Sequence, residues 1–156
     1  MRTRHSRLVG LVAAFGVSLA SVAVSASAAE SPLRGTVNAV ETGQVVFPSR
    51  FLDRNGTGTA TQLGRYTEHV VMTINIPTLS SMGAATFTAA NGDTLTASVV
   101  GQATRTGPTA LSIVEDYTIT GGTGRFADAT GTFTLHSTLN QTTGVSTGTF
   151  SGAIDH

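Results

Sequence analysis

The chain has 156 residues, 12% of which are charged, and it contains no cysteine, tryptophan or lysine. One domain fits this length, and a single core of this size buries enough apolar surface to be stable. Nine basic residues balance nine acidic ones. The basic excess typical of proteins that bind nucleic acid or anionic membranes is therefore missing, which excludes those partners.

The first 28 residues have the three parts of a secretory signal peptide in order. Arg2, Arg4 and Arg7 form a basic start, residues 8–24 form an apolar run, and Ala26-Ser27-Ala28 offers a cleavage site after Ala28 or Ala26. The run of about 17 residues is short for a membrane span, and no second one follows. We therefore expect no stable membrane anchor, but a secreted, extracytoplasmic protein. Its mature domain, residues 29–156, keeps six arginines against nine acids, a net charge of about −3.

The first part of the mature domain is rich in glycine and arginine. Residues 33–41 and 44–47 are predicted as two short strands joined at Thr42-Gly43. Residues 48–59, PSRFLDRNGTGT, have the composition of a loop with a turn signal at Asn55-Gly56. At about 12 residues this loop exceeds most connections in a compact domain, which is typical of a lid or rim segment.

From residue 66 onward, apolar and polar residues alternate with a period of two, as in half-buried strands. The predicted strands cover residues 66–76, 84–90, 93–104, 110–120, 130–139 and 144–154. Turn signals at Pro77, Asn91-Gly92, Gly107-Pro108 and residues 140–143 separate most of them. One face of each strand is mainly apolar, and the other is rich in threonine, which suits a pleated surface in water.

This pattern predicts an all-β fold without helices. About eight strands with one apolar face each indicate an antiparallel meander. Closing the meander into a small calycin-like β-barrel leaves no open strand edge, and the many glycines allow close strand approach. A two-sheet sandwich is the alternative.

A glycine-dense corner, Gly122-x-Gly124-x-x-Ala127, matches the dinucleotide-binding fingerprint after a strand. That fingerprint requires a helix whose N-terminus holds the pyrophosphate, followed by an acid about 20 residues on. Here the chain leads into another strand, and residues 140–144 contain no acid. We therefore predict a structural corner in which glycine supplies positive φ, and no cofactor.

The sequence favours neither a nucleophilic catalytic site nor a metal site. There is no cysteine, and His136 and Ser137 are successive strand residues that point to opposite faces. His69 and His136 fall on polar faces, and His156 is the last residue. No two histidines have the spacing of metal ligands, so we predict no metal.

Two carboxylates, Glu68 and Glu115, fall on apolar strand faces, where an unpaired charge is costly. One interpretation places each near the barrel mouth or beside an arginine such as Arg65, Arg105 or Arg125. The other has both line a ligand cavity together with Tyr66 and Tyr117. Apolar walls would there raise a carboxyl pKa towards that of a general acid.

Residues 117–131, YTITGGTGRFADATG, run from a strand through a G-G-T-G-[KR]-[FY] corner and out through a small residue and glycine. This stretch resembles the allene oxide cyclase-like and dirigent-like barrel proteins. Residues 58–67 resemble a segment of small secreted bacterial proteins of this kind. The resemblance implies an eight-stranded antiparallel barrel with an apolar cavity, often in a homo-oligomer. Plant members cyclise an epoxide or steer radical coupling, but only the corner aligns here, so no catalytic residue carries over.

Three functions follow as hypotheses. The first is a secreted, non-enzymatic barrel that binds a small hydrophobic molecule. The second is a cofactor-free cyclase or isomerase with Glu68 or Glu115 as acid or base. The third is an extracellular structural or interaction protein that assembles through its threonine-rich faces. A deep apolar pocket containing both carboxyls favours the second, and a filled interior favours the third.

Overall fold

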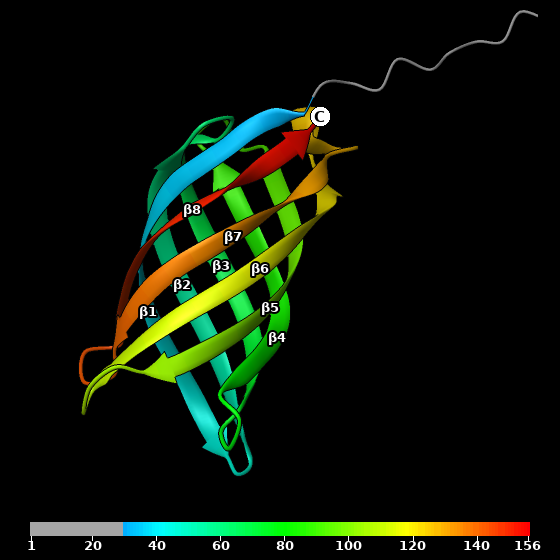
Figure 1. The fold of residues 1–156 in the computed structure, drawn as a ribbon. Coiled ribbons are helices and arrows are strands. Elements are labelled where there is room, and N and C mark those ends of the chain that lie inside the picture. The colour runs from blue at the N-terminus through cyan, green and yellow to red at the C-terminus, as the bar shows by residue number, and fades with distance from the viewer. Residues whose placement is uncertain (1–29) are drawn as a thin grey trace, which may run out of the picture.

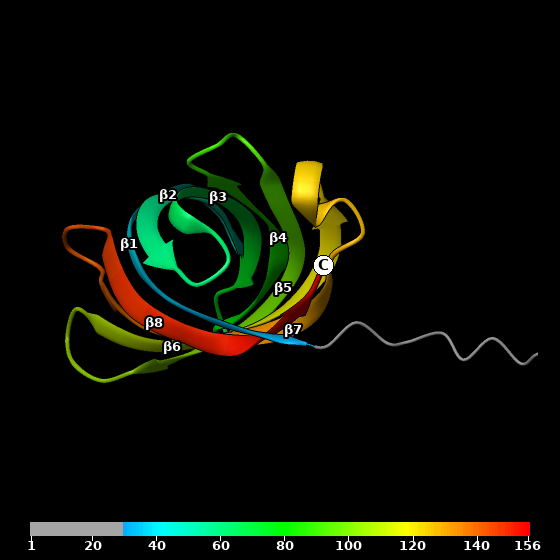
Figure 2. The ribbon, with the colours of Figure 1, turned by 90° about the horizontal axis from the view of Figure 1, so that it is seen from above.

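The computed structural model describes residues 30–156, which form one closed barrel of eight antiparallel strands (Figure 1). The strands are β1 (Ser31–Val46), β2 (Ser49–Ala60), β3 (Gly64–Asn75), β4 (Ser80–Ala89), β5 (Thr94–Arg105), β6 (Ala110–Gly122), β7 (Thr130–Asn140) and β8 (Val145–Asp155). Each pairs with its neighbours in sequence, and β8 pairs with β1 to close the ring (Figure 2). The predicted barrel is confirmed, and the sandwich is excluded. The expected signal peptide lies outside the described residues.

Alternation along the strands places one set of side chains inside the barrel and the other in solvent. Val70, Leu95 and Ile154 are completely buried, whereas outward residues such as Thr67 and Thr118 are exposed. In the part of the chain that the structure describes, no helix is long and apolar enough to cross a membrane.

The predicted boundary at Thr42-Gly43 is wrong, because residues 31–46 form one continuous strand. Thr42 pairs with Asp53 and Gly43 pairs with Leu52, so the ladder to β2 continues through the expected turn. A Cβ atom on Gly43 would collide with the carbonyl oxygen of Phe51. Glycine here therefore serves close strand approach rather than a turn.

The predicted loop over residues 48–59 is also wrong, because Ser49–Ala60 is the strand β2. It pairs along its length with β1 and β3, so it is neither a lid nor a rim segment. Among its inward positions only Leu52 is large and apolar. The others carry arginine or small residues: Arg50, Arg54, Gly56, Gly58 and Ala60. The small residues leave room for large side chains from neighbouring strands, which explains why the composition resembles that of a loop.

The glycine corner has the structural role predicted for it. Gly121 and Gly124 have φ values of 120° and 56°, in the left-handed region that favours glycine. Between β6 and β7 the chain makes only one short 3₁₀ turn, η1 (Gly124–Phe126), and buries Phe126 at this end of the barrel.

Aromatic side chains fill the half of the barrel nearest η1. Tyr117 stacks on Phe133 with ring centroids 4.5 Å apart, and Phe87 meets both rings edge to face at 5.9 and 5.8 Å. Tyr66 and Phe150 complete the cluster. The interior is thus densely packed towards η1, and any space for a ligand must lie towards the opposite end.

Gly58 gives a test of this packing. A Cβ atom there would collide with the carbonyl oxygen of Thr36 and lie 2.6 Å from the Tyr66 hydroxyl oxygen. We expect Gly58→Ala to lower the free energy of unfolding by about 1–3 kcal/mol, as overpacking does, measured by urea denaturation. Gly107→Ala is the control, because its nearest neighbour would be the Ala110 Cβ at 3.6 Å, an ordinary contact. Equal stability of the two variants would contradict the packing argument.

Candidate functional site

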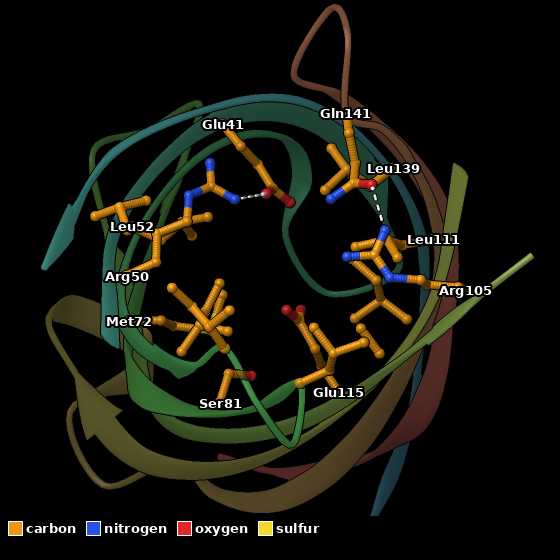
Figure 3. A pocket seen from close by; sticks show the side chains of 16 residues that line it. Glu41, Arg50, Leu52, Met72, Ser81, Arg105, Leu111, Glu115, Leu139 and Gln141 are labelled. Carbon is orange, nitrogen blue, oxygen red and sulfur yellow. Dashed lines mark hydrogen bonds and ion pairs between the residues drawn. The ribbon is translucent and has the colours of Figure 1, made fainter. Parts of the chain in front are cut away.

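The end of the barrel opposite η1 contains a cavity of about 220 Å³ (Figure 3). Its walls are mostly apolar and include Leu52, Met72, Ile74, Leu111, Ile113 and Leu139. Arg50, Arg105 and Gln141 stand where strands end and mark the mouth, while Glu41 and Glu115 supply carboxyl groups to the wall. The cavity thus combines an apolar wall with a few fixed polar groups.

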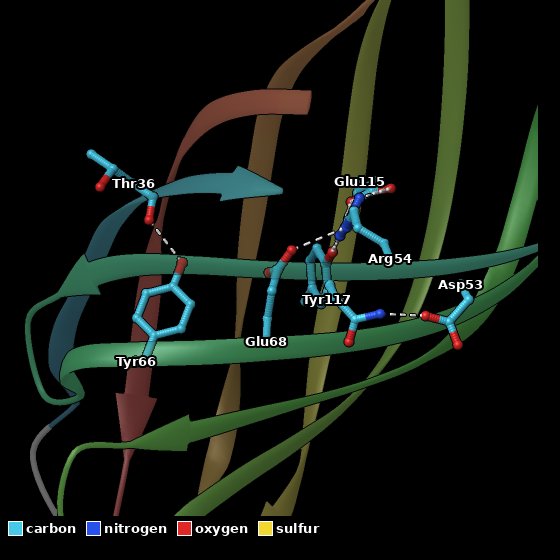
Figure 4. A network of polar contacts seen from close by, with 8 residues as sticks. Thr36, Asp53, Arg54, Tyr66, Glu68, Glu115 and Tyr117 are labelled. Atoms are coloured by element: carbon cyan, nitrogen blue, oxygen red, sulfur yellow. Dashed lines mark hydrogen bonds and ion pairs between the residues drawn. The ribbon is translucent and has the colours of Figure 1, made fainter. Parts of the chain in front are cut away.

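Beneath Glu115, the guanidinium of Arg54 crosses the interior from β2 to β6 (Figure 4). Its Nη1 lies 3.0 Å from both carboxyl oxygens of Glu115, and its Nη2 donates to Glu115 Oε2 at 3.0 Å and to the Tyr117 hydroxyl at 2.6 Å. The Tyr117 hydroxyl donates in turn to Glu115 Oε2 at 2.7 Å. Such bidentate, charge-assisted contacts fix all three groups in one arrangement.

Glu68 joins the same cluster from β3. Its Oε1 lies 3.1 Å from Arg54 Nε, close enough for an ion pair but without hydrogen-bond alignment. Gly56 on the neighbouring strand leaves the space, because a Cβ atom there would lie 3.0 Å from Glu68 Oε1. Burial raises the pKa of Glu68, against the opposing effect of the Arg54 charge.

Tyr66 lies apart from this cluster. Its hydroxyl donates to the Thr36 carbonyl oxygen at 2.8 Å, and its ring packs against Phe87 and Phe150. Burial raises the pKas of both Tyr66 and Tyr117. Of the four residues expected at a ligand site, Glu68, Glu115 and Tyr117 meet at Arg54, and only Glu115 lines the cavity.

The expected arginine partners are wrong, although the pairing itself is correct. Arg105 is exposed and its Nη1 lies 3.4 Å from the Gln141 side-chain oxygen, while Arg125 contacts the Gln62 carbonyl oxygen. Glu68 and Glu115 pair with Arg54, which the sequence placed in a loop. Treating residues 49–60 as a strand would have put Arg54 on the inward face.

Glu41 is the second site residue that the sequence analysis missed. It lies on β1 opposite Arg54 in the strand register, its side chain is 3% exposed, and its Oε2 is 3.9 Å from Arg50 Nη1. Burial raises the pKa of Glu41, while the charges of Arg54 and Arg50 act in the opposite direction. Its position at the end of a predicted strand concealed this role.

The interior therefore holds three buried carboxyl groups around one buried guanidinium. Burial alone would lower the pKa of Arg54, but Tyr117 and the surrounding carboxyls raise it, so the guanidinium stays charged. Burial raises the pKas of Glu41 and Glu68, which favours the neutral form of each carboxyl. Among residues 30–156, no three His, Cys, Asp or Glu side chains are grouped as metal ligands.

No protein-family model and no curated protein sequence matches the chain. Among solved structures, the barrel is similar to a pterocarpan synthase dirigent protein, with a TM-score of 0.63 and 18% sequence identity. The match covers 92% of this chain and 99% of that protein. The likeness confirms the expectation raised by residues 117–131: the chain has the fold of a dirigent-like barrel.

Proposed function

We propose that the protein binds a small apolar molecule in the cavity at the open end of its barrel. The observation that carries this proposal is the contrast between the two halves of the interior, one filled by aromatic rings and the other hollow. A cavity of about 150 Å³ accommodates benzene, so about 220 Å³ suits a ring with a short substituent. Apolar walls with a few oriented polar groups are typical of small-molecule sites.

The Arg54 cluster serves as the floor of this site. The guanidinium and the hydroxyl of Tyr117 hold Glu115 from below, so the floor is rigid and is already formed before a ligand enters. Preorganisation of this kind lowers the entropic cost of binding.

A cofactor-free cyclisation or isomerisation is the second candidate. The cavity carboxyls favour it, and the similar solved structure is that of a pterocarpan synthase dirigent protein. Both oxygens of Glu115 are held by Arg54, and Glu68 does not line the cavity. Either residue would need rearrangement to act on a ligand, which places binding without catalysis first.

We further propose that the protein acts outside the cytoplasm, supported by the signal-peptide pattern of residues 1–28. The expected result is a protein recovered from the medium of an exporting host whose first residue is Ala29 or Ser27, determined by N-terminal sequencing. Recovery only from cells, with Met1 or Arg2 still in place, would contradict export.

Filling the cavity tests the binding proposal. Ile113 lines the cavity, and Ile113→Phe would displace roughly two buried CH₂ groups of a ligand, which corresponds to about tenfold weaker binding. Binding is measured by the fluorescence of the apolar probe N-phenyl-1-naphthylamine, whose phenyl ring fits the cavity while its larger naphthyl group remains at the open mouth.

Val100→Phe is the matched control, because Val100 is 56% exposed on the outer wall. It should bind the probe as the wild-type protein does. Equal loss in both variants, or saturable binding unchanged in Ile113→Phe, would show that the probe does not occupy the cavity.

The buried carboxyl of Glu68 beneath the cavity also predicts that the stability of the protein depends on pH. Because the folded protein raises the pKa of Glu68 above its ordinary value of 4.5, it binds more protons than the unfolded chain above that pH. The free energy of unfolding should therefore fall as pH rises from 4.5 through the folded pKa. Glu68→Gln should flatten this decline, measured by urea denaturation between about pH 4.5 and 8.

Glu30→Gln is the control for this series, because Glu30 is exposed before β1. It should keep the wild-type slope. A Glu68→Gln variant with the same slope as Glu30→Gln would show that Glu68 contributes no protons to the folded state in this range.

A further inference from the structure

We propose that the cavity selects molecules carrying a neutral hydrogen-bond acceptor, such as a carbonyl or ether oxygen, and that Glu41 donates the hydrogen bond. This inference rests on the proposed binding function and specifies its ligand class. Glu41 points from β1 into the cavity opposite the wall formed by β5 and β6 (Figure 3).

Glu115, the other cavity carboxyl, is already engaged. Its two oxygens accept from Arg54, and Oε2 accepts from the Tyr117 hydroxyl as well. A ligand that used Glu115 would have to compete with a charged bidentate contact, the strongest class of side-chain hydrogen bond. Glu115 is therefore a poor partner for an incoming ligand.

Glu41 differs, because its side chain makes no hydrogen bond to any residue between 30 and 156. The Arg50 guanidinium nitrogen is 3.9 Å away, beyond hydrogen-bond range. The Glu41 oxygens are not fully enclosed by protein and line the cavity, so a ligand oxygen there would supply a hydrogen-bond partner.

Burial favours the neutral form of Glu41, while the surrounding charges act in both directions. Arg50 and Arg54 face it from β2, Glu68 from β3 and Glu115 from β6. Arg54 is committed to Glu115, and Arg50 is partly exposed at the mouth, so neither cation offsets the loss of hydration on burial. Burial accordingly raises the pKa of Glu41. A protonated carboxyl donates one hydrogen bond, which matches an acceptor oxygen.

This arrangement disfavours charged ligands inside the cavity. An anion would lie beside the Glu115 carboxylate, and a cation would lie near the charges of Arg50 in the wall and of Arg54 beneath it. A carboxylate ligand is an alternative only at the mouth, where Arg50 and Arg105 stand. In that position its acidic group would leave Glu41 without a partner.

The test compares acetophenone with α-methylstyrene, a ligand of the same shape. In α-methylstyrene a CH₂ group replaces the carbonyl oxygen of acetophenone. Each displaces N-phenyl-1-naphthylamine from the protein at pH 5. The preference for the ketone is the dissociation constant of α-methylstyrene divided by that of acetophenone. We expect this preference to be roughly 3- to 10-fold larger in the wild-type protein than in Glu41→Leu, because one net hydrogen bond contributes a free energy of this size.

Glu41→Gln separates hydrogen bonding from folding and charge. Its amide group still donates, so the ketone preference should persist and should not change with pH. In the wild-type protein the preference should fall at higher pH, as Glu41 loses its proton. Glu30→Gln, at an exposed position outside the cavity, should behave like the wild-type protein.

Three results would overturn the inference. Tight probe binding with the same ratio in the wild-type protein and Glu41→Leu would remove the role of Glu41 and leave the binding function intact. Benzoate displacing the probe more strongly than acetophenone would assign the polar contact to the mouth arginines. Absence of probe binding by the wild-type protein would overturn the proposed function, and this inference with it.

Discussion

The barrel depends on a single buried guanidinium. Removing Arg54 and its carboxyl partners from water costs several kcal/mol for each ion, and only close, well-aligned contacts offset that cost. Arg54 on β2 meets Glu68 on the neighbouring strand β3 and Glu115 on β6. Because β2 and β6 do not pair, the contact with Glu115 links strands across the interior. It also separates the packed half of the interior from the hollow half.

Small residues on β2 make this arrangement sterically feasible. Gly56 leaves space for Glu68, and Gly58 leaves space for the Tyr66 ring. At these two positions β2 has no side chain, and the side chains of Glu68 and Tyr66 from β3 occupy the space. The interior is thus built by complementary neighbours rather than by strands that are each apolar on one face.

The combination of small residues on β2 with large side chains on neighbouring strands explains what the sequence could and could not predict. Regular alternation from residue 66 onward correctly placed Glu68, Glu115 and Tyr117 on inward faces. It failed at residues 49–60, because arginine and glycine at inward positions imitate a loop. The pairing of Glu115 with Arg54 spans the barrel, so it depends on closure and register, which local periodicity does not contain. Glu41 was missed because its strand continues past the expected turn.

The pairing of β8 with β1 has a consequence for how the site comes into being. Every other pairing joins strands adjacent in sequence, whereas this one brings Ser31 opposite Ile154. The closing contact therefore spans the whole described chain and carries the largest loop-closure entropy. Because Glu41 on β1 and Leu139 on β7 belong to the same cavity, a chain still lacking its last strand has half-barrels but no enclosed site. The proposed binding would therefore require all eight strands.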